Sequence, residues 1–139
     1  MGMPRGVGGV RECGTPAFVK ALDDVIVAIM VEKRECVEDL DAILSTKGID
    51  MVQFGPADYA MNIGLAGQWT HPDVLTVERI TIETAFRKGI HPRVEIDQPS
   101  QAARYLEMGV KHFCMGWDAA PPQRRLTIVG KICDVSGGE

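Results

Sequence analysis

The chain has 139 residues, of which 45% are hydrophobic and 24% are charged, and its formal net charge is −4. This composition is typical of a globular protein with one ordinary core. A pI near 5.4 without a cluster of Lys and Arg disfavours nucleic acid or an anionic membrane surface as a partner. The longest apolar run, residues 25–31, is far shorter than the roughly 20 residues that span a bilayer. We therefore expect a cytoplasmic protein with no nucleic-acid or membrane partner.

The cysteines and histidines are scattered along the chain. No C-x-x-C pair occurs, which excludes the usual zinc and redox motifs and predicts free thiols at Cys13, Cys36, Cys114 and Cys133. The histidines are His71, His91 and His112, and their spacing makes no metal motif. His71 and His91 each precede a proline, so we interpret them as residues that enter a helix or a strand.

The first half of the chain predicts two strands with a helix between them. After a short helix that begins at Thr15-Pro16, the unbroken apolar run at 25–31 predicts a strand buried on both faces, which stops at Glu32. Residues 35–46 carry an apolar stripe at helical spacing, with Gly48 as a plausible cap. Met51–Phe54 is the second strand.

The second half continues the alternation. Residues 55–70 form an unusually long connection. His71-Pro72-Asp73 then opens the best helix of the chain, which closes at Gly89. A strand at 93–96, a helix at 99–108 and a strand at 112–115 follow. Beyond Asp118 the periodicity is lost, and residues 123–135 fit a helix or a strand equally well.

Four strands alternating with helices indicate an α/β fold of parallel β-α units. A closed (β/α)8 TIM barrel typically needs about 250 residues, so this chain could form about half of one. The edge strands of an open half barrel would present unpaired backbone groups. We therefore expect either that the chain associates, as a homo-oligomer, or that an N-terminal half is missing.

Two carboxylates follow the two neighbouring strands of the first half. Glu32 comes directly after the first strand, and Asp58 follows Gly55-Pro56 at the end of the second. Two hard oxygen donors at adjacent strand ends suit a divalent cation with positions left for water and substrate. The competing interpretations are that Glu32 pairs with a nearby Lys or Arg, and that Asp58 caps a helix.

A family resemblance rests on these same residues. The segments Val-Glu-Lys-Arg-Glu at 31–35, Gly-Ile-Asp-Met-Val-Gln-Phe-Gly-Pro-Ala-Asp at 48–58, and Gly-Trp-Asp at 116–118 resemble the HpcH/HpaI family of metal-dependent pyruvate aldolases. Gly64, Gly67, His71-Pro72 and residues 104–109 continue the match in the same order. The resemblance runs roughly from Arg5 to Asp118. It divides the chain into a partial barrel domain, residues 1–118, and a divergent C-terminal tail, residues 119–139.

The resemblance implies the C-terminal half of a β/α barrel of the phosphoenolpyruvate/pyruvate superfamily type. Members cleave 4-hydroxy-2-oxo acids to pyruvate and an aldehyde with Mg²⁺, Mn²⁺ or Co²⁺ as a Lewis acid. The matching metal ligands are Glu32 and Asp58, and Glu95 matches a residue near the aldehyde end of the site. The implied binding segment for the pyruvate carboxylate consists of Gly55, Pro56, Ala57 and Asp58. Because proline has no N–H, Ala57 and Asp58 are the expected donors.

In the family, the histidine general base, its aspartate partner and an arginine that stabilises the enolate come from early strands, ahead of this region. We therefore assign no catalytic residue. The leading hypothesis is an aldolase that needs an N-terminal half for turnover. The alternative is a non-catalytic half barrel that binds a divalent metal and a 2-oxo acid or serves in association. A third possibility is a complete small α/β binding domain unrelated to aldolases.

Overall fold

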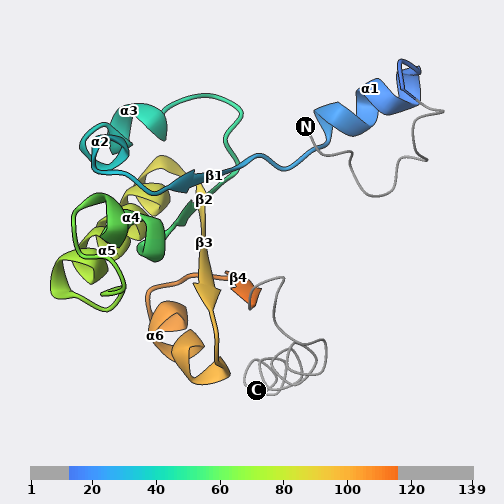
Figure 1. The fold of residues 1–139 in the computed structure, drawn as a ribbon. Helices are drawn as coiled ribbons and strands as arrows, with labels where there is room; N and C mark the ends of the chain where they lie inside the picture. Colours follow the sequence, from blue (N-terminus) through green and yellow to red (C-terminus); the bar gives the residue numbers. More distant parts are fainter. Residues whose placement is uncertain (1–12, 116–139) are drawn as a thin grey trace.

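A computed structural model describes residues 13–115, and these form a four-stranded parallel sheet (Figure 1). The strands are β1 (Ala28–Val31), β2 (Met51–Phe54), β3 (His91–Ile96) and β4 (His112–Met115), and they lie side by side in chain order. Each successive pair is parallel, as the alternation of strands and helices predicts. The described chain is therefore an open run of β-α units.

Helices make every connection between strands. The sheet is preceded by α1 (Pro16–Asp23). The connection from β1 to β2 contains α2 (Arg34–Glu38) and α3 (Leu40–Ile43), and the next contains α4 (Pro56–Asn62) and α5 (Pro72–Lys88). The last contains a 3-10 turn, η2 (Pro99–Gln101), and α6 (Ala102–Glu107). Figure 1 shows α1 standing apart from the other helices, and none of its residues is buried.

The two faces of the sheet differ in character because side chains alternate along a strand. One face packs under the connecting helices, and its buried residues are Val31, Val52, Phe54, Val94 and Ile96. The other face carries a row in lateral register, which we call the inner-face row: Met30, Gln53, Arg93 and His112. The hydrophobic core of the described chain therefore lies between the sheet and its helices, and the inner face is polar.

The prediction that residues 25–31 form a strand buried on both faces is wrong. The strand begins only at Ala28, Ile26 is 68% exposed and Met30 is 51% exposed. The physical reason is that β1 is an edge strand of the described sheet, and its inner face has no covering layer among residues 13–115. Val31 belongs to the core and Ile29 packs against it, whereas Val25, Ile26, Val27 and Met30 are exposed.

Four other features differ from the sequence prediction. The expected helix at 35–46 is interrupted at Asp39, which is the C-cap of α2 and the N-cap of α3. The backbone of Asp39 has a φ of −100° and a ψ of 15°. The expected loop at 55–70 begins with α4, and β3 starts at His91 rather than at residue 93. The cap of α3 is Leu44, whereas Gly48 lies in a later turn with a φ of 86°.

The best-predicted helix, α5, has the expected ends. The His71 side chain caps it by accepting a 3.2 Å hydrogen bond from the Asp73 N–H, and Gly89 closes it with a φ of 73°. Cys13, Cys36 and Cys114 are free thiols, as predicted. Within the described part, no helix is both long and apolar enough to cross a membrane. Cys133, the final element at 123–135 and the expected tail at 119–139 lie outside the described residues.

Candidate functional site

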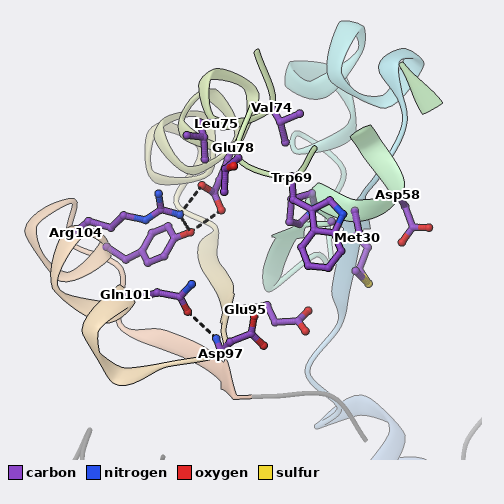
Figure 2. A pocket seen from close by; sticks show the side chains of 15 residues that line it. Met30, Asp58, Trp69, Val74, Leu75, Glu78, Glu95, Asp97, Gln101 and Arg104 are labelled. Atoms are coloured by element: carbon purple, nitrogen blue, oxygen red, sulfur yellow. Dashed lines mark hydrogen bonds and ion pairs between the residues drawn. The ribbon is translucent and has the colours of Figure 1, made fainter. Parts of the chain in front are cut away.

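A pocket of about 360 Å³ opens at the carboxyl ends of the strands (Figure 2). Active sites of β/α barrels lie at this end of the strands. One wall of the pocket comes from the ends of β1 and β2, and the opposite wall comes from α5, η2 and α6. Its lining consists of Met30, Gly55, Pro56, Ala57, Asp58, Trp69, Thr70, Val74, Leu75, Glu78, Glu95, Asp97, Gln101, Arg104 and Tyr105.

Glu32 lies directly against Gly55. A Cβ atom built on Gly55 would be 2.7 Å from Glu32 Cγ and 3.0 Å from Glu32 Oε1, closer than side chains approach one another. The φ of Gly55 is −102°, a conformation that any residue can adopt, so the glycine is required by space rather than by backbone geometry. The missing side chain at position 55 thus lets Glu32 occupy the end of β2.

Asp58 lies three residues further on, in the first turn of α4, and is exposed. Gly55 is the N-cap of this helix, so the hypothesis that Asp58 is the cap is wrong. Within residues 13–115, neither Glu32 nor Asp58 has a salt-bridge partner. The competing interpretation of Glu32 as one half of an ion pair therefore has no support in the described chain.

The backbone around Asp58 offers two free donors to the pocket. The Gly55 N–H donates to the Val31 carbonyl at 2.9 Å, and the Tyr59 N–H donates to the Gly55 carbonyl at 3.0 Å. Pro56 has no N–H. The N–H groups of Ala57 and Asp58 belong to the first turn of α4 and so have no partner within the helix. An anionic group in the pocket could accept from them.

The donor set fits a hard divalent cation. Among the residues that the structure describes, no three His, Cys, Asp or Glu side chains gather into a complete ligand shell. Glu32, which lies against Gly55, and Asp58, in the first turn of α4, each offer only oxygen donors. Mg²⁺ and similar ions are commonly held by one or two carboxylates and keep several waters or substrate oxygens. The Glu32 side chain occupies the space that Gly55 leaves open.

Glu95 projects into the pocket from the inner face of β3. Burial raises the pKa of its carboxyl group, the nearby Asp97 raises it further, and Arg93 acts in the opposite direction. The Gln53 Nε2 group donates a long hydrogen bond, 3.4 Å, to Glu95 Oε2. Gln53 is only 5% exposed, and its Oε1 atom has no hydrogen-bond partner among the described residues.

The opposite wall of the pocket is held by a network that joins α5 to α6 (Figure 2). The Tyr105 hydroxyl donates to Glu78 Oε1 at 2.7 Å, and Arg104 Nη2 lies 3.2 Å from Glu78 Oε2. Arg104 also donates to the Tyr105 hydroxyl and lies over the Tyr105 ring, with its guanidinium carbon 4.3 Å from the centroid. Burial and the Glu78 carboxylate raise the pKa of Tyr105 to about 12, so its hydroxyl stays protonated at neutral pH. The charge of Arg104 is thus compensated within the protein.

The structure brings Gly55, Pro56, Ala57, Asp58 and Glu95 together in one pocket and places Glu32 against its Gly55 edge. The sequence reasoning missed the second wall. Glu78, Arg104 and Tyr105 lie on helices whose periodicity shows only an apolar stripe. Gln53, which donates a hydrogen bond to Glu95, could have been found because it is a polar residue in an otherwise apolar strand.

Comparisons with known proteins find a family model and relatives that this chain resembles in sequence. The family model described as HpcH/HpaI aldolase/citrate lyase matches residues 3–120. A 4-hydroxy-2-oxo-heptane-1,7-dioate aldolase of Escherichia coli is 35% identical over 99 residues, which are 71% of this chain and 38% of the relative. The enzyme of the same name from Salmonella paratyphi B is 34% identical over the same shares. The chain thus spans less than half the length of these relatives.

Solved structures show the same relationship. An HpcH/HpaI aldolase/citrate lyase family protein from Burkholderia cenocepacia J2315 superimposes with a TM-score of 0.71 at 25% identity, covering 96% of this chain and 52% of the other. The HpcH/HpaI aldolase from Desulfitobacterium hafniense DCB-2 gives a TM-score of 0.69 at 25% identity, covering 88% and 47%. The predicted α/β fold, a part of a β/α barrel, is therefore confirmed. The chain belongs to the HpcH/HpaI aldolase/citrate lyase family.

Proposed function

We propose that this chain carries the metal-binding and 2-oxo-acid-binding part of an aldolase-type carbon–carbon lyase. The observation that supports it most directly is the contact of Glu32 with Gly55, at the start of the helix turn that holds Asp58. Both carboxylates are free of ion pairs within residues 13–115. Carboxylates that lie at adjacent strand ends and have no cationic side chain as a partner are available to a divalent cation, which prefers oxygen ligands.

Each residue of the segment has a role in this proposal. Glu32 and Asp58 hold a divalent ion, Mg²⁺, Mn²⁺ or Co²⁺. When bound, the ion supplies Lewis-acid polarisation of the 2-oxo acid. The N–H groups of Ala57 and Asp58 bind the carboxylate of a 2-oxo acid such as pyruvate. Gly55 and Pro56 place those donors at the pocket and offer no free N–H themselves.

The histidines of the chain do not serve this pocket. His71 caps α5, and His91 and His112 begin β3 and β4, at the end of the sheet opposite to the pocket. General acid–base catalysis typically contributes about 10²–10⁴ in rate. We therefore expect the 139-residue chain to bind a 2-oxo acid with a metal but to cleave 4-hydroxy-2-oxo acids poorly, because the family resemblance places the acid–base residues ahead of this region.

Calorimetric titration of the purified chain with oxalate, with and without Mn²⁺, tests this proposal beside a pyruvate-release assay. We expect oxalate to bind only with Mn²⁺ and pyruvate release to be weak. Absence of oxalate binding under both conditions would remove the proposed site. Robust pyruvate release would instead assign catalysis to a group within this chain, of which Glu95 is the first candidate, because its carboxyl group lines the pocket, has no ion-pair partner among the described residues and has a pKa raised by burial.

Glu95 is expected to select against ligands with an acidic tail. A carboxylate at the far side of the pocket repels a second carboxylate on the ligand. Glu95→Gln should therefore improve Mn²⁺-dependent binding of a 2-oxo diacid by about tenfold, or 1.4 kcal/mol, while binding of a 2-oxo monoacid with an apolar tail stays the same.

The pH dependence gives an independent check on Glu95. Because its pKa is raised, lowering the pH should neutralise Glu95 before an ordinary glutamate and improve binding of the diacid relative to the monoacid. This pH effect should vanish in Glu95→Gln. Glu107→Gln is the matched control, since Glu107 is an exposed glutamate of α6 that does not line the pocket. An unchanged preference in Glu95→Gln would refute this role.

A further inference from the structure

The largest apolar side chain that lines the pocket has no part in the proposed binding of the metal and the carboxylate. Trp69 lies in the connection between α4 and α5 and is 45% exposed, and Met30, which also lines the pocket, is 51% exposed. Figure 2 shows the indole ring of Trp69 beside Met30, between Asp58 and the opposite wall at Arg104. An accessible apolar surface inside a ligand pocket is available to the apolar part of a ligand.

The turn that carries Trp69 is held in place on both sides. The Gln68 N–H donates to the Leu65 carbonyl at 2.9 Å, and the His71 N–H donates to the Gln68 carbonyl at 3.0 Å. The Leu65 N–H in turn donates to the Ala60 carbonyl of α4 at 2.7 Å, and the His71 side chain caps α5. Trp69 is therefore fixed between α4, which carries a proposed metal ligand, and α5, which forms the opposite wall.

The charges around Trp69 disfavour a charged ligand tail. Among the described residues that line the pocket, Arg104 is the only Lys or Arg, and Glu78 compensates its charge. Glu95 and Asp97 also line the pocket, and neither has a salt-bridge partner within residues 13–115, so an anionic tail would meet two carboxylates. Burial raises the pKa of Glu95, which means that this part of the pocket penalises charge of either sign. An uncharged tail avoids both costs.

We propose that Trp69 determines the specificity of this pocket and that the ligand tail it recognises is an uncharged aromatic ring. The inference rests on the proposed function, in which the 2-oxo-acid end of the ligand is held at Asp58. An aromatic ring packs favourably on an indole, and a methionine sulfur such as that of Met30 makes favourable contacts with aromatic rings. The edge of an aromatic ring carries partial positive charge, so it can face the Glu95 and Asp97 carboxylates without repulsion.

The pocket has room for such a tail. Its volume of about 360 Å³ lies within the range of roughly 300–1,000 Å³ that is typical of small-molecule sites. A small acid such as pyruvate would fill only part of this space. The substrate class that the inference names is therefore 4-hydroxy-2-oxo acids with an aromatic group on the carbon that carries the hydroxyl.

Calorimetric titration with 2-oxo-4-phenylbutanoate in the presence of Mn²⁺ tests this inference, since this acid lacks the hydroxyl group and cannot be cleaved. Because burial of an aromatic ring is favourable, we expect it to bind at least about tenfold more tightly than pyruvate. Trp69→Ala should reduce this preference to about twofold, whereas Trp69→Phe, which keeps an aromatic ring, should retain most of it. Phe86→Ala is the matched control and should leave the preference unchanged, because Phe86 is an exposed aromatic residue, 42% exposed, that does not line this pocket.

Comparison of ligands on the unaltered chain does not depend on how any variant folds. If pyruvate binds with Mn²⁺ but the phenyl group adds no affinity, the inference is overturned and the proposed function stands. Equal or tighter binding of the cyclohexyl analogue, or of a 2-oxo acid with a guanidinium tail, would also overturn it, because the tail would then be recognised by apolar area or by charge. Binding of the phenyl acid that needs Trp69 but not Mn²⁺ would instead support the aromatic subsite and contradict the proposed metal site. Absence of binding by either acid would overturn both.

Discussion

Asp58→Asn is expected to lower the Mn²⁺-dependent affinity for oxalate by at least about 100-fold, or roughly 2.7 kcal/mol. The substitution keeps the size of the side chain and the backbone N–H donor, but it removes one of only two anionic ligands that we assign to the ion. Affinity for hard divalent cations depends strongly on the number of charged ligands. Because Asp58 is exposed, its loss should change the free energy of unfolding little.

Asp73→Asn is the matched control for this variant. Asp73 is also an exposed aspartate in the first turn of a helix, α5, and its carboxylate likewise complements the positive end of the helix dipole. Any loss of folding stability that comes only from the helix dipole, about 0.3–1 kcal/mol, should appear in both variants. If Asp58→Asn and Asp73→Asn bind oxalate equally well with Mn²⁺, Asp58 is not a ligand.

The fold was predictable where local signals and burial agree. α5 has a capping residue, a first-turn proline, an apolar stripe and a terminal glycine, and its ends lie where these signals place them. The segment 25–31 had a strong apolar signal, but residues 13–115 provide no layer over its inner face, and Val25, Ile26, Val27 and Met30 are exposed. An apolar run predicts that a segment prefers to be covered, and it does not tell which part of an assembly covers it.

The candidate site was predictable in one wall and not in the other. Glu32 and the segment 55–58 could be found because the ends of adjacent parallel strands converge at one edge of a sheet, and because the family pattern marks the same residues. The network of Glu78, Arg104 and Tyr105 joins α5 to α6 through residues that are 26 and 27 positions apart in sequence. Which faces of α5 and α6 meet is decided by packing on the sheet, and no local pattern encodes it.

The contact between Glu32 and Gly55 also connects the fold to the proposed chemistry. Val31 is the last residue of β1 and Phe54 is the last residue of β2, and the two are paired in register. Both side chains are buried under the helices, which fixes the ends of the two strands. The next residues, Gly55 and Glu32, are therefore fixed side by side at the strand ends. Core packing on one face of the sheet thus determines where a carboxylate lies at the pocket.

Gly55→Ala is expected to displace the Glu32 side chain and to lower Mn²⁺-dependent oxalate affinity by at least about tenfold, or 1.4 kcal/mol. The new methyl group would lie 2.7 Å from Glu32 Cγ, so one of the two must move. Overpacking of this kind typically costs about 1–3 kcal/mol in the free energy of unfolding. Denaturant unfolding and calorimetric titration of the same preparation would measure both effects.

Two further variants separate the steric effect from other consequences of adding a methyl group. Gly89→Ala, at a φ of 73° with nothing within 4 Å of the new atom, should cost about 1–2 kcal/mol of stability through backbone strain and leave oxalate binding intact. Adding Glu32→Ala to Gly55→Ala should restore stability, because the crowded side chain is gone, but should not restore binding. If Gly55→Ala binds oxalate with Mn²⁺ as well as the parent chain does, then Glu32 is not held in place for an ion, and its contact with Gly55 is packing alone.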